Sequence, residues 1–297
     1  MFVTLRKKKL VCIALMAAAV LLSLKCLMLI CARAAAPAGP EQQGIYVPIV
    51  LYNGIVPEGY PAGPADLTPG QLENDLRLLR ELGYNTVFVN DLVCYVDYGV
   101  PLPEKPVVLS FEGGPLACRS VLQPLLEKYG MRASVSVCGR FTTDATESAE
   151  PPDPCSSCLS WRDIRAMRDS GRFEFCSLTD SMNALSPRRG VLRLESESYQ
   201  SYRRAFLNDD QSMKKFCEQN CGFKPNVFVY PYGLSDRASR TLVNDCCYDA
   251  SLLIGTGENL ITQGEPSTLL GLERRCRPAM VSSEDFFAGL LPECEKD

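Results

Sequence analysis

The sequence predicts an α/β fold in which helices cover a mainly parallel sheet. Short runs rich in Val, Ile and Phe alternate some six or seven times with amphipathic helical patterns. Such alternation is typical of βαβ units, in which successive strands are parallel. Because the alternating region is about 250 residues long, a closed or nearly closed barrel fits it best.

The expected strands are short apolar runs bounded by turn residues. They are Ile45–Tyr52, Thr86–Val89, Val107–Ser110, Ala133–Val137, Phe173–Ser177, Val227–Tyr230 and Ala250–Leu253. Three unusual stretches follow directly on strands: the end of Val107–Gly114, then Cys176–Leu185, and then Tyr230–Gly233. Side chains at the carboxyl ends of parallel strands converge on one crevice. We therefore expect these three stretches to line one pocket.

Capping residues and glycines mark the expected helices. Thr68-Pro69-Gly70-Gln71 forms a capping box with Pro at the first helical position, and Gly83 ends that helix. Further helices are expected around Arg119–Lys128, after Ser160, over Glu197–Asn220, after Ser235 and after Ser282. The stretch Thr142–Cys158 is rich in acids, prolines and serines, and is predicted to be a surface loop.

A basic cluster and a long apolar run open the chain. Leu10–Cys31 would span about 33 Å as a helix, enough to cross a bilayer. Since basic residues stay on the cytoplasmic side, residues 1–9 are predicted to be cytoplasmic and 10–31 to be a single-pass signal-anchor in the cell membrane. Residues 32–44 then form a linker, 45–292 an extracytoplasmic domain and 293–297 a tail. Ala34-Ala35-Ala36 leaves an alternative open, namely secretion after signal-peptide cleavage.

Charge and cysteine content restrict the partners and the compartment. Residues 1–36 hold six of the 31 basic residues and none of the 35 acidic ones, so 25 basic residues face 35 acidic ones in the remainder. This balance argues against nucleic acid as a partner. Twelve of the 15 cysteines lie outside the apolar run, which favours structural disulfides in an oxidising compartment. Unpaired thiols, or a zinc site that includes Cys155 and Cys158, are the alternatives.

The chain contains no histidine. This absence excludes Ser-His-Asp and Cys-His catalysis as they are usually built, as well as histidine-ligated zinc and a histidine general acid or base. Carboxylates, tyrosines, lysines and cysteines remain for any chemistry.

Four stretches resemble the polysaccharide deacetylase family, also called the NodB-homology domain or carbohydrate esterase family 4. Tyr46–Val56 resembles the family's opening strand, and Leu102–Gly114 resembles its Thr-Phe-Asp-Asp-Gly motif. Leu159–Leu185 resembles the helix and strand before Ser-His-Thr-x-x-His, and Tyr230–Gly233 resembles a Pro-Tyr step at a strand end. The resemblance implies a distorted (β/α) barrel and a hydrolase that uses a divalent metal, usually zinc, to remove acetyl groups from glycans.

The family's site residues carry over to positions that have changed here. By resemblance, Glu112 stands at the position of the general base, Gly113 at that of the aspartate ligand, and Leu178 and Met182 at those of the two histidine ligands. Gly and Leu have no ligand atom, and a Met thioether is a poor partner for zinc. We therefore expect no metal and no other cofactor. The expected substrate groove consists of Ser110, Asp180, Tyr230, Pro231, Tyr232 and Gly233.

Three functions remain open. The first is a membrane-anchored pseudo-deacetylase that binds cell-envelope glycan, or a partner, without metal-dependent hydrolysis. The second is an active hydrolase of carbon–nitrogen bonds other than peptide bonds, which removes N-acetyl groups from peptidoglycan or a related polysaccharide through Glu112 and a non-standard site. The third is a scaffold whose pocket is closed by Leu178 and Met182.

Overall fold

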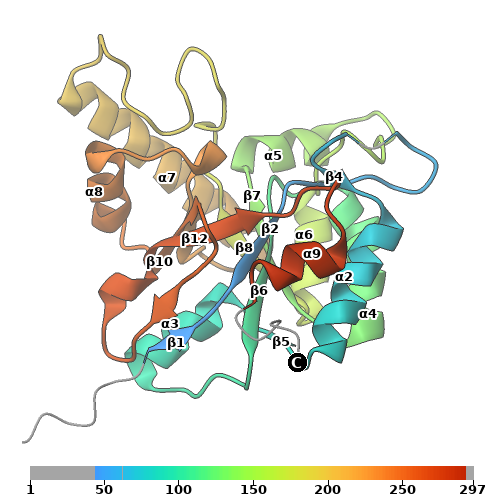
Figure 1. The fold of residues 1–297 in the computed structure, drawn as a ribbon. Coiled ribbons are helices and arrows are strands. Elements are labelled where there is room, and N and C mark those ends of the chain that lie inside the picture. Colours follow the sequence, from blue (N-terminus) through green and yellow to red (C-terminus); the bar gives the residue numbers. More distant parts are fainter. Residues whose placement is uncertain (1–43, 62, 292–297) are drawn as a thin grey trace, which may run out of the picture. The chain divides into compact units, whose positions relative to one another are not determined.

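Seven parallel strands close into a barrel in the computed structural model, which describes residues 44–61 and 63–291 (Figure 1). Around the ring these are β2 (Ile49–Tyr52), β6 (Pro106–Phe111), β7 (Ala133–Val137), β8 (Phe173–Ser177), β9 (Val227–Val229), β10 (Ala250–Ile254) and β12 (Leu270–Cys276). β12 returns to pair with β2, and every pairing in the ring is parallel. The predicted α/β class and its parallel barrel are therefore confirmed.

The barrel is distorted at one junction. β8 and β9 share the single register pair Ser177↔Phe228, whereas β7 and β8 share five pairs. β5 (Asn85–Thr86) adds to the outer edge of β6 in parallel. Two small sheets lie apart from the ring: β1 (Ile45–Tyr46) with β11 (Leu260–Ile261), and β3 (Gly54–Ile55) with β4 (Asp66–Leu67).

Helices surround the ring. They are α2 (Pro69–Glu81), α3 (Val89–Tyr98), η1 (Cys118–Leu122), α4 (Gln123–Tyr129), α5 (Gly139–Glu147), α6 (Trp161–Asp169), α7 (Tyr199–Cys221), η2 (Pro231–Gly233), α8 (Arg237–Asp245), η3 (Pro266–Leu269) and α9 (Ser283–Ala288). The predicted caps Thr68, Ser160 and Ser282 each accept a hydrogen bond from a backbone N–H of the first helical turn.

Several predicted elements differ from the structure. The strand predicted over Ile45–Tyr52 is divided at Pro48, which has no N–H to donate to a neighbouring strand. The strand predicted over Thr86–Val89 ends at Thr86, and α3 begins where it was expected to continue. The predicted loop Thr142–Cys158 starts inside helix α5. The cap of α8 is Asp236 rather than Ser235, because the Asp236 Oδ1 accepts from the Ser239 N–H at 2.7 Å.

Alternate strand residues face the helices and the barrel interior. Val107, Leu109 and Phe111 of β6 join the core beneath the outer helices, whereas Val108 joins an interior cluster with β8, β9, β10 and α3. The interior members of α3 are Val89, Leu92, Val93 and Val96. α3 therefore closes the amino end of the barrel (Figure 1), so the carboxyl end is the one free for a site.

A buried ion pair links α2 to the segment after β12. The Arg277 guanidinium donates two hydrogen bonds to the Asp75 carboxylate, at 2.9 and 3.0 Å. Ser283 at the start of α9 donates to the same carboxylate at 2.6 Å, and Tyr52 of β2 donates to it at 3.3 Å. Both charged side chains are 0 or 1% exposed. One carboxylate thus joins three separate parts of the sequence, around residues 52, 75 and 277–283.

The predicted disulfides are wrong for the described cysteines. All eleven of them are unpaired, including Cys155 and Cys158, and six are buried. Buried cysteines pack as small apolar side chains. Burial raises the pKa of the Cys138 thiol to about 12 and raises the pKa of Cys118 further.

The predicted transmembrane helix over residues 10–31, the segment 1–9 and the tail 293–297 lie outside the described residues. Within residues 44–61 and 63–291, none of the helices combines the length and the apolar character that a membrane span requires.

Candidate functional site

Glu112 and a buried arginine form the centre of the carboxyl end of the barrel. Arg274, on the inner side of β12, is 0% exposed, and its Nη2 donates to the Glu112 Oε2 at 2.8 Å. The same guanidinium donates to the Ser110 hydroxyl at 3.3 Å and to the Leu253 carbonyl at 3.1 Å. The Glu112 side chain is 17% exposed. The carboxylate is therefore the part of this pair that solvent or a ligand reaches.

The backbone around this pair is left-handed at the ends of three strands. After β6, Gly113 and Gly114 have φ of 83° and 59°. After β8, Thr179 has a φ of 71°, and after β9, Tyr232 has a φ of 59°. This conformation is strained for residues other than glycine, and especially for β-branched ones, so strain of this kind indicates a functional site.

Tyr232 is the exposed aromatic residue of the predicted groove. Its side chain is 39% exposed, and its hydroxyl donates to the Asn183 carbonyl at 3.4 Å. Burial, and then the nearby negative charge of Glu112, raises the pKa of Tyr232. The structure thus brings Ser110, Glu112 and Tyr232 together.

The neighbours of Tyr232 do not reach the surface in the same way. Tyr230 is 2% exposed and packs edge-on against Phe228 on the outer side of the barrel, with ring centroids 5.1 Å apart. Pro231 is buried, and Gly233 is half-buried against Ile254. Of these four residues of the expected groove, Tyr232 is therefore the exposed one.

A carboxylate from α7 fixes the loop that follows β8. The Asp209 Oδ1 accepts from the N–H groups of Ser181 and Met182 at 2.7 and 3.1 Å, and its Oδ2 accepts from the N–H of Asp180 at 2.8 Å. Burial raises the pKa of Asp209 to about 6, although these three donors favour its charged form. The loop is thus held by Asp209, which was not among the site residues predicted from the sequence.

The Asp180 side chain is turned toward α5 and α7. A methyl group at Gly139 would lie 2.4 Å from the Asp180 Oδ1 and 3.1 Å from the Met213 sulfur, so the carboxylate fills the space beside these helices. The Oδ1 atom is buried and has no hydrogen-bond partner among the described residues. Burial raises the pKa of Asp180. Asp180 therefore contributes its backbone, rather than its carboxylate, to the wall of the site.

The positions at which the resemblance implies metal ligands do not offer a ligand set. Gly113 has no side chain, and Leu178 is 1% exposed within the apolar interior cluster. Met182 packs against the cluster between α7 and α8. Burial raises the pKa of the nearby thiol of Cys138 to about 12, which keeps it protonated. No three His, Cys, Asp or Glu side chains of the described part of the chain are arranged to hold a metal ion. These residues do not fit a divalent cation.

The parallel barrel, with Glu112 following the strand β6, is the one expected of the resemblance noted in the sequence. A family model for polysaccharide deacetylases matches residues 99–251, which is more than half of the chain. The chain belongs to this family. Comparison with curated protein sequences gives no match.

Solved structures, two of which are named as deacetylases, share the fold of this family member. The de-N-acetylase from Aggregatibacter actinomycetemcomitans is 20% identical, with a TM-score of 0.70 over 83% of this chain and 100% of the other. The deacetylase PplD from Streptococcus pyogenes, solved with acetate, is 16% identical, with a TM-score of 0.64 over 84% and 100%. IcaB from Ammonifex degensii is 18% identical, with a TM-score of 0.61 over 78% and 92%.

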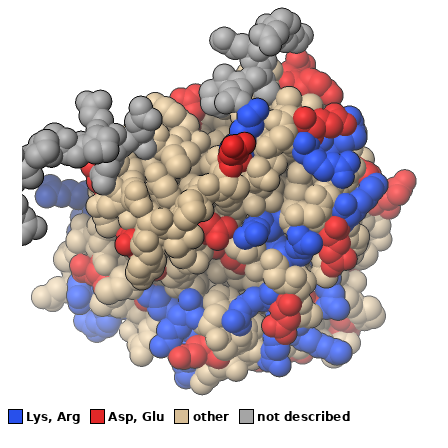
Figure 2. All heavy atoms as spheres, turned by 90° about the horizontal axis from the view of Figure 1, so that it is seen from below, with Lys and Arg blue, Asp and Glu red and all other residues tan. Residues whose placement is uncertain are grey.

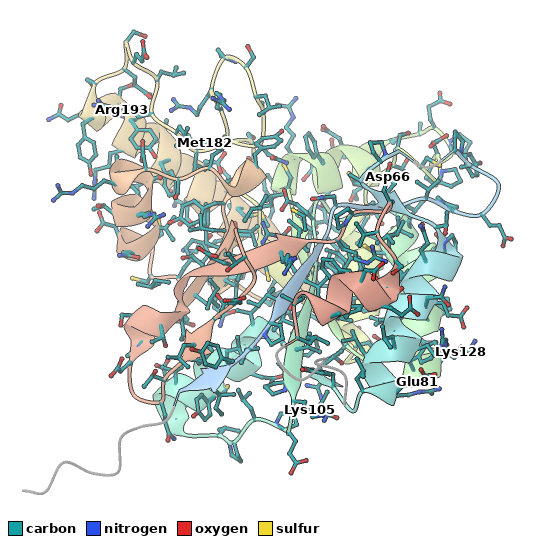
Figure 3. All side chains as sticks on the ribbon, in the orientation of Figure 1. Asp66, Glu81, Lys105, Lys128, Met182 and Arg193 are labelled. Carbon is teal, nitrogen blue, oxygen red and sulfur yellow. The ribbon has the colours of Figure 1, made fainter. Side chains whose placement is uncertain are left out.

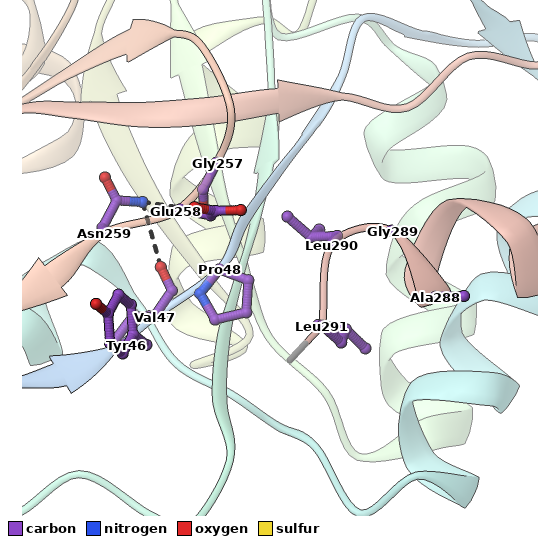
Figure 4. Close-up of a pocket in the computed structure, with 10 residues that line it drawn as sticks. All are labelled: Tyr46, Val47, Pro48, Gly257, Glu258, Asn259, Ala288, Gly289, Leu290 and Leu291. Atoms are coloured by element: carbon purple, nitrogen blue, oxygen red, sulfur yellow. Dashed lines mark hydrogen bonds between the residues drawn. The ribbon is translucent and has the colours of Figure 1, made fainter. Parts of the chain in front are cut away.

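A separate cavity of about 360 Å³ lies at the amino end of β2 (Figure 4). It is lined by Tyr46–Pro48, Gly257–Asn259 and Ala288–Leu291. The Asn259 side-chain amide lies in the wall of this cavity and donates hydrogen bonds to the carbonyls of Val47 and Gly257, each at 3.2 Å. None of the residues that line this cavity belongs to the carboxyl-end site.

Proposed function

We propose that this deacetylase-family protein binds a glycan of the cell envelope at the carboxyl end of its barrel, without metal-dependent hydrolysis. The observation that supports this best is the position of Leu178. Its side chain packs in the apolar interior cluster, at the position where the resemblance implies a histidine ligand. Metal-assisted hydrolysis needs a cation that activates water and polarises the carbonyl. The residues at this point supply no side chain for that cation.

Two groups at the site suit a sugar. Arg274 fixes one oxygen of the Glu112 carboxylate, which leaves the other as an acceptor for a sugar hydroxyl. Tyr232 presents an exposed ring beside it, on which the apolar face of a sugar can stack. The predicted anchor over residues 10–31 would place this site outside the cell membrane, within reach of envelope polymers.

One observation favours the alternative, an active N-deacetylase. A general base must reach the water that it deprotonates, and the partly exposed Glu112 carboxylate has one oxygen that Arg274 does not bind. An active enzyme would use Glu112 to take a proton from water. It would need another group to stabilise the negative charge that develops on the carbonyl oxygen.

Three measurements on the purified full-length protein separate these functions. They are its zinc content, acetate release from chitin hexasaccharide or peptidoglycan, and binding of the same glycans. We expect no stoichiometric zinc, no acetate and measurable binding that Tyr232→Ala removes. Tyr46→Ala, an exposed tyrosine at the other end of the barrel, is the control and should bind normally.

Each outcome has one interpretation. Stoichiometric zinc together with acetate release that Glu112→Gln abolishes would establish the enzyme instead. Absence of glycan binding in an otherwise folded protein would leave the scaffold. Binding that is equally strong in Tyr232→Ala would place the glycan site elsewhere.

A further inference from the structure

The arginines of the described chain differ in whether their side chains have partners. Many pair with carboxylates, as Arg77, Arg119, Arg132, Arg188, Arg274 and Arg277 do, or donate to carbonyls, as Arg165, Arg168 and Arg172 do. Within residues 44–61 and 63–291, five exposed arginines of one region make no ion pair and no side-chain hydrogen bond: Arg189, Arg193, Arg203, Arg204 and Arg237. Arg162 on α6 is likewise unpaired but lies apart from them.

These five residues form what we call the arginine lobe, on the loop before α7, on the first turns of α7 and on α8. Between residues 188 and 204 the sequence has five arginines and two glutamates, in a chain whose net charge is −4. The opposite side of the molecule, seen from below in Figure 2, instead shows basic and acidic side chains next to one another on its right and lower parts, beside a largely uncharged area. Positive charge is therefore concentrated locally on an acidic protein.

The acids of this region are mostly committed to other partners. Glu197 accepts from Arg188 at 2.8 Å, and Asp236 caps α8 by accepting from the Ser239 N–H. Glu195 is exposed and is the remaining acid of the loop. The arginine lobe thus keeps most of its positive charge.

A hollow of about 430 Å³ lies within the lobe. Arg193, Tyr199 and Arg237 line it, together with Asp236, Ala238 and Thr241. Tyr199 is 42% exposed, and Arg203 follows it by one helical turn on the same face of α7. Two guanidinium groups and an aromatic ring therefore face one space.

The lobe is continuous with the carboxyl-end site. A methyl group at Gly190 would lie 3.1 Å from the Pro231 carbonyl and 3.7 Å from the Tyr232 ring, so the segment that carries Arg189 lies directly against Tyr232. Figure 3 shows Arg193 and Met182 in the same upper part of the molecule. A polymer bound at Tyr232 can therefore extend over the arginines.

We propose that the ligand of this protein is an anionic glycan, whose carboxylate or phosphate groups bind the arginine lobe while its sugars lie on Tyr232 and Tyr199. The planar guanidinium fork suits carboxylate and phosphate oxygens, and two donors reach one group at once. This inference rests on the proposed glycan-binding function. It specifies, in addition, that the bound polymer is negatively charged.

The test compares oligosaccharides of equal length on the full-length protein. Hyaluronan hexasaccharide carries carboxylates and N-acetylglucosamine, and chitin hexasaccharide is its neutral counterpart. We expect Arg193→Gln with Arg237→Gln to weaken hyaluronan binding about tenfold or more, with chitin binding unchanged. Raising the ionic strength should weaken hyaluronan binding alone. Arg162→Gln with Lys215→Gln, which removes the same charge away from the lobe, is the control.

Further binding measurements identify which anionic group the lobe recognises. A poly(glycerol phosphate) that binds more tightly than hyaluronan, and loses its binding in the same double variant, would assign the lobe to phosphate. Equal hyaluronan affinity in the two double variants would overturn the inference. So would a hexanucleotide of single-stranded DNA that binds as tightly as hyaluronan. If neither chitin nor hyaluronan binds, the proposed function fails, whereas hyaluronan binding that does not depend on Arg193 and Arg237 overturns the lobe alone.

Discussion

Removing the Glu112 side chain should destabilise the protein far more than its partly exposed position suggests. Glu112→Ala leaves the guanidinium of Arg274, which is 0% exposed, without its counter-charge. An uncompensated buried charge costs about 3–5 kcal/mol. Glu112→Gln also removes the counter-charge but keeps an oxygen that accepts from Nη2, so we expect it to cost less than Glu112→Ala, about 1–3 kcal/mol.

A double-mutant cycle isolates the pair from the surrounding packing. Urea unfolding, followed by circular dichroism, gives the free energy of unfolding for wild type, Glu112→Ala, Arg274→Met and the double variant. Because the double variant has neither charge, it should be more stable than the sum of the two single changes predicts. We expect a coupling energy of about 1.5–3 kcal/mol.

Additivity of the two changes, to within about 0.5 kcal/mol, would refute the reasoning, because it would mean that the two side chains do not interact in solution. A loss of stability in Glu112→Gln as large as that in Glu112→Ala would also contradict it, since the amide retains the hydrogen bond. The same data identify Glu112→Gln as the variant with which binding and catalysis are tested without unfolding the site.

Three further changes test other parts of the structure. In urea unfolding, Asp75→Ala should lower the free energy of unfolding by about 3–5 kcal/mol, because it leaves a buried arginine unpaired. Glu81→Ala, on the exposed face of the same helix, is the control and should change it by less than about 0.5 kcal/mol. Burial raises the pKa of Glu174 from 4.5 to about 7. Because the unfolded chain loses this proton at a lower pH than the folded protein, the free energy of unfolding should fall by about 3 kcal/mol as the pH rises from about 4.5 to 7. Urea midpoints measured across that range should show this trend in the wild type, and Glu174→Gln should remove it. Gly139→Ala should lower the melting temperature, since its methyl group would overlap a buried carboxylate oxygen at 2.4 Å, and Gly70→Ala, with open space around it in α2, should raise it slightly.

The sequence predicted the strands whose apolar residues are continuous and whose ends carry glycine or a capping residue. β6, β7 and β8 were found in this way, and Glu112 was selected because it follows β6. α3 was missed because its first residue, Val89, continues the apolar run of Val87 and Phe88, which is typical of a strand. Its start depends on Asp91, which accepts from the Phe88 N–H at 2.8 Å.

The most important omission is Arg274. Leu270–Arg277 contains three arginines within four positions, a pattern typical of an exposed segment. Two of them are buried because carboxylates from distant parts of the chain meet them, Glu112 at a separation of 162 residues and Asp75 at 202. Such pairing depends on how β12 closes the barrel, which local patterns do not contain. The same holds for Asp209, whose role is set by the loop that it contacts from α7.

The single register pair between β8 and β9 has a consequence for how this domain can change over evolutionary time. Few backbone hydrogen bonds would be broken if the connection between these strands, residues 178–226, grew or shrank. That connection carries α7 and four of the five lobe arginines. Selection on the ligand that we propose for the lobe can therefore act on a connection whose length the rest of the ring tolerates.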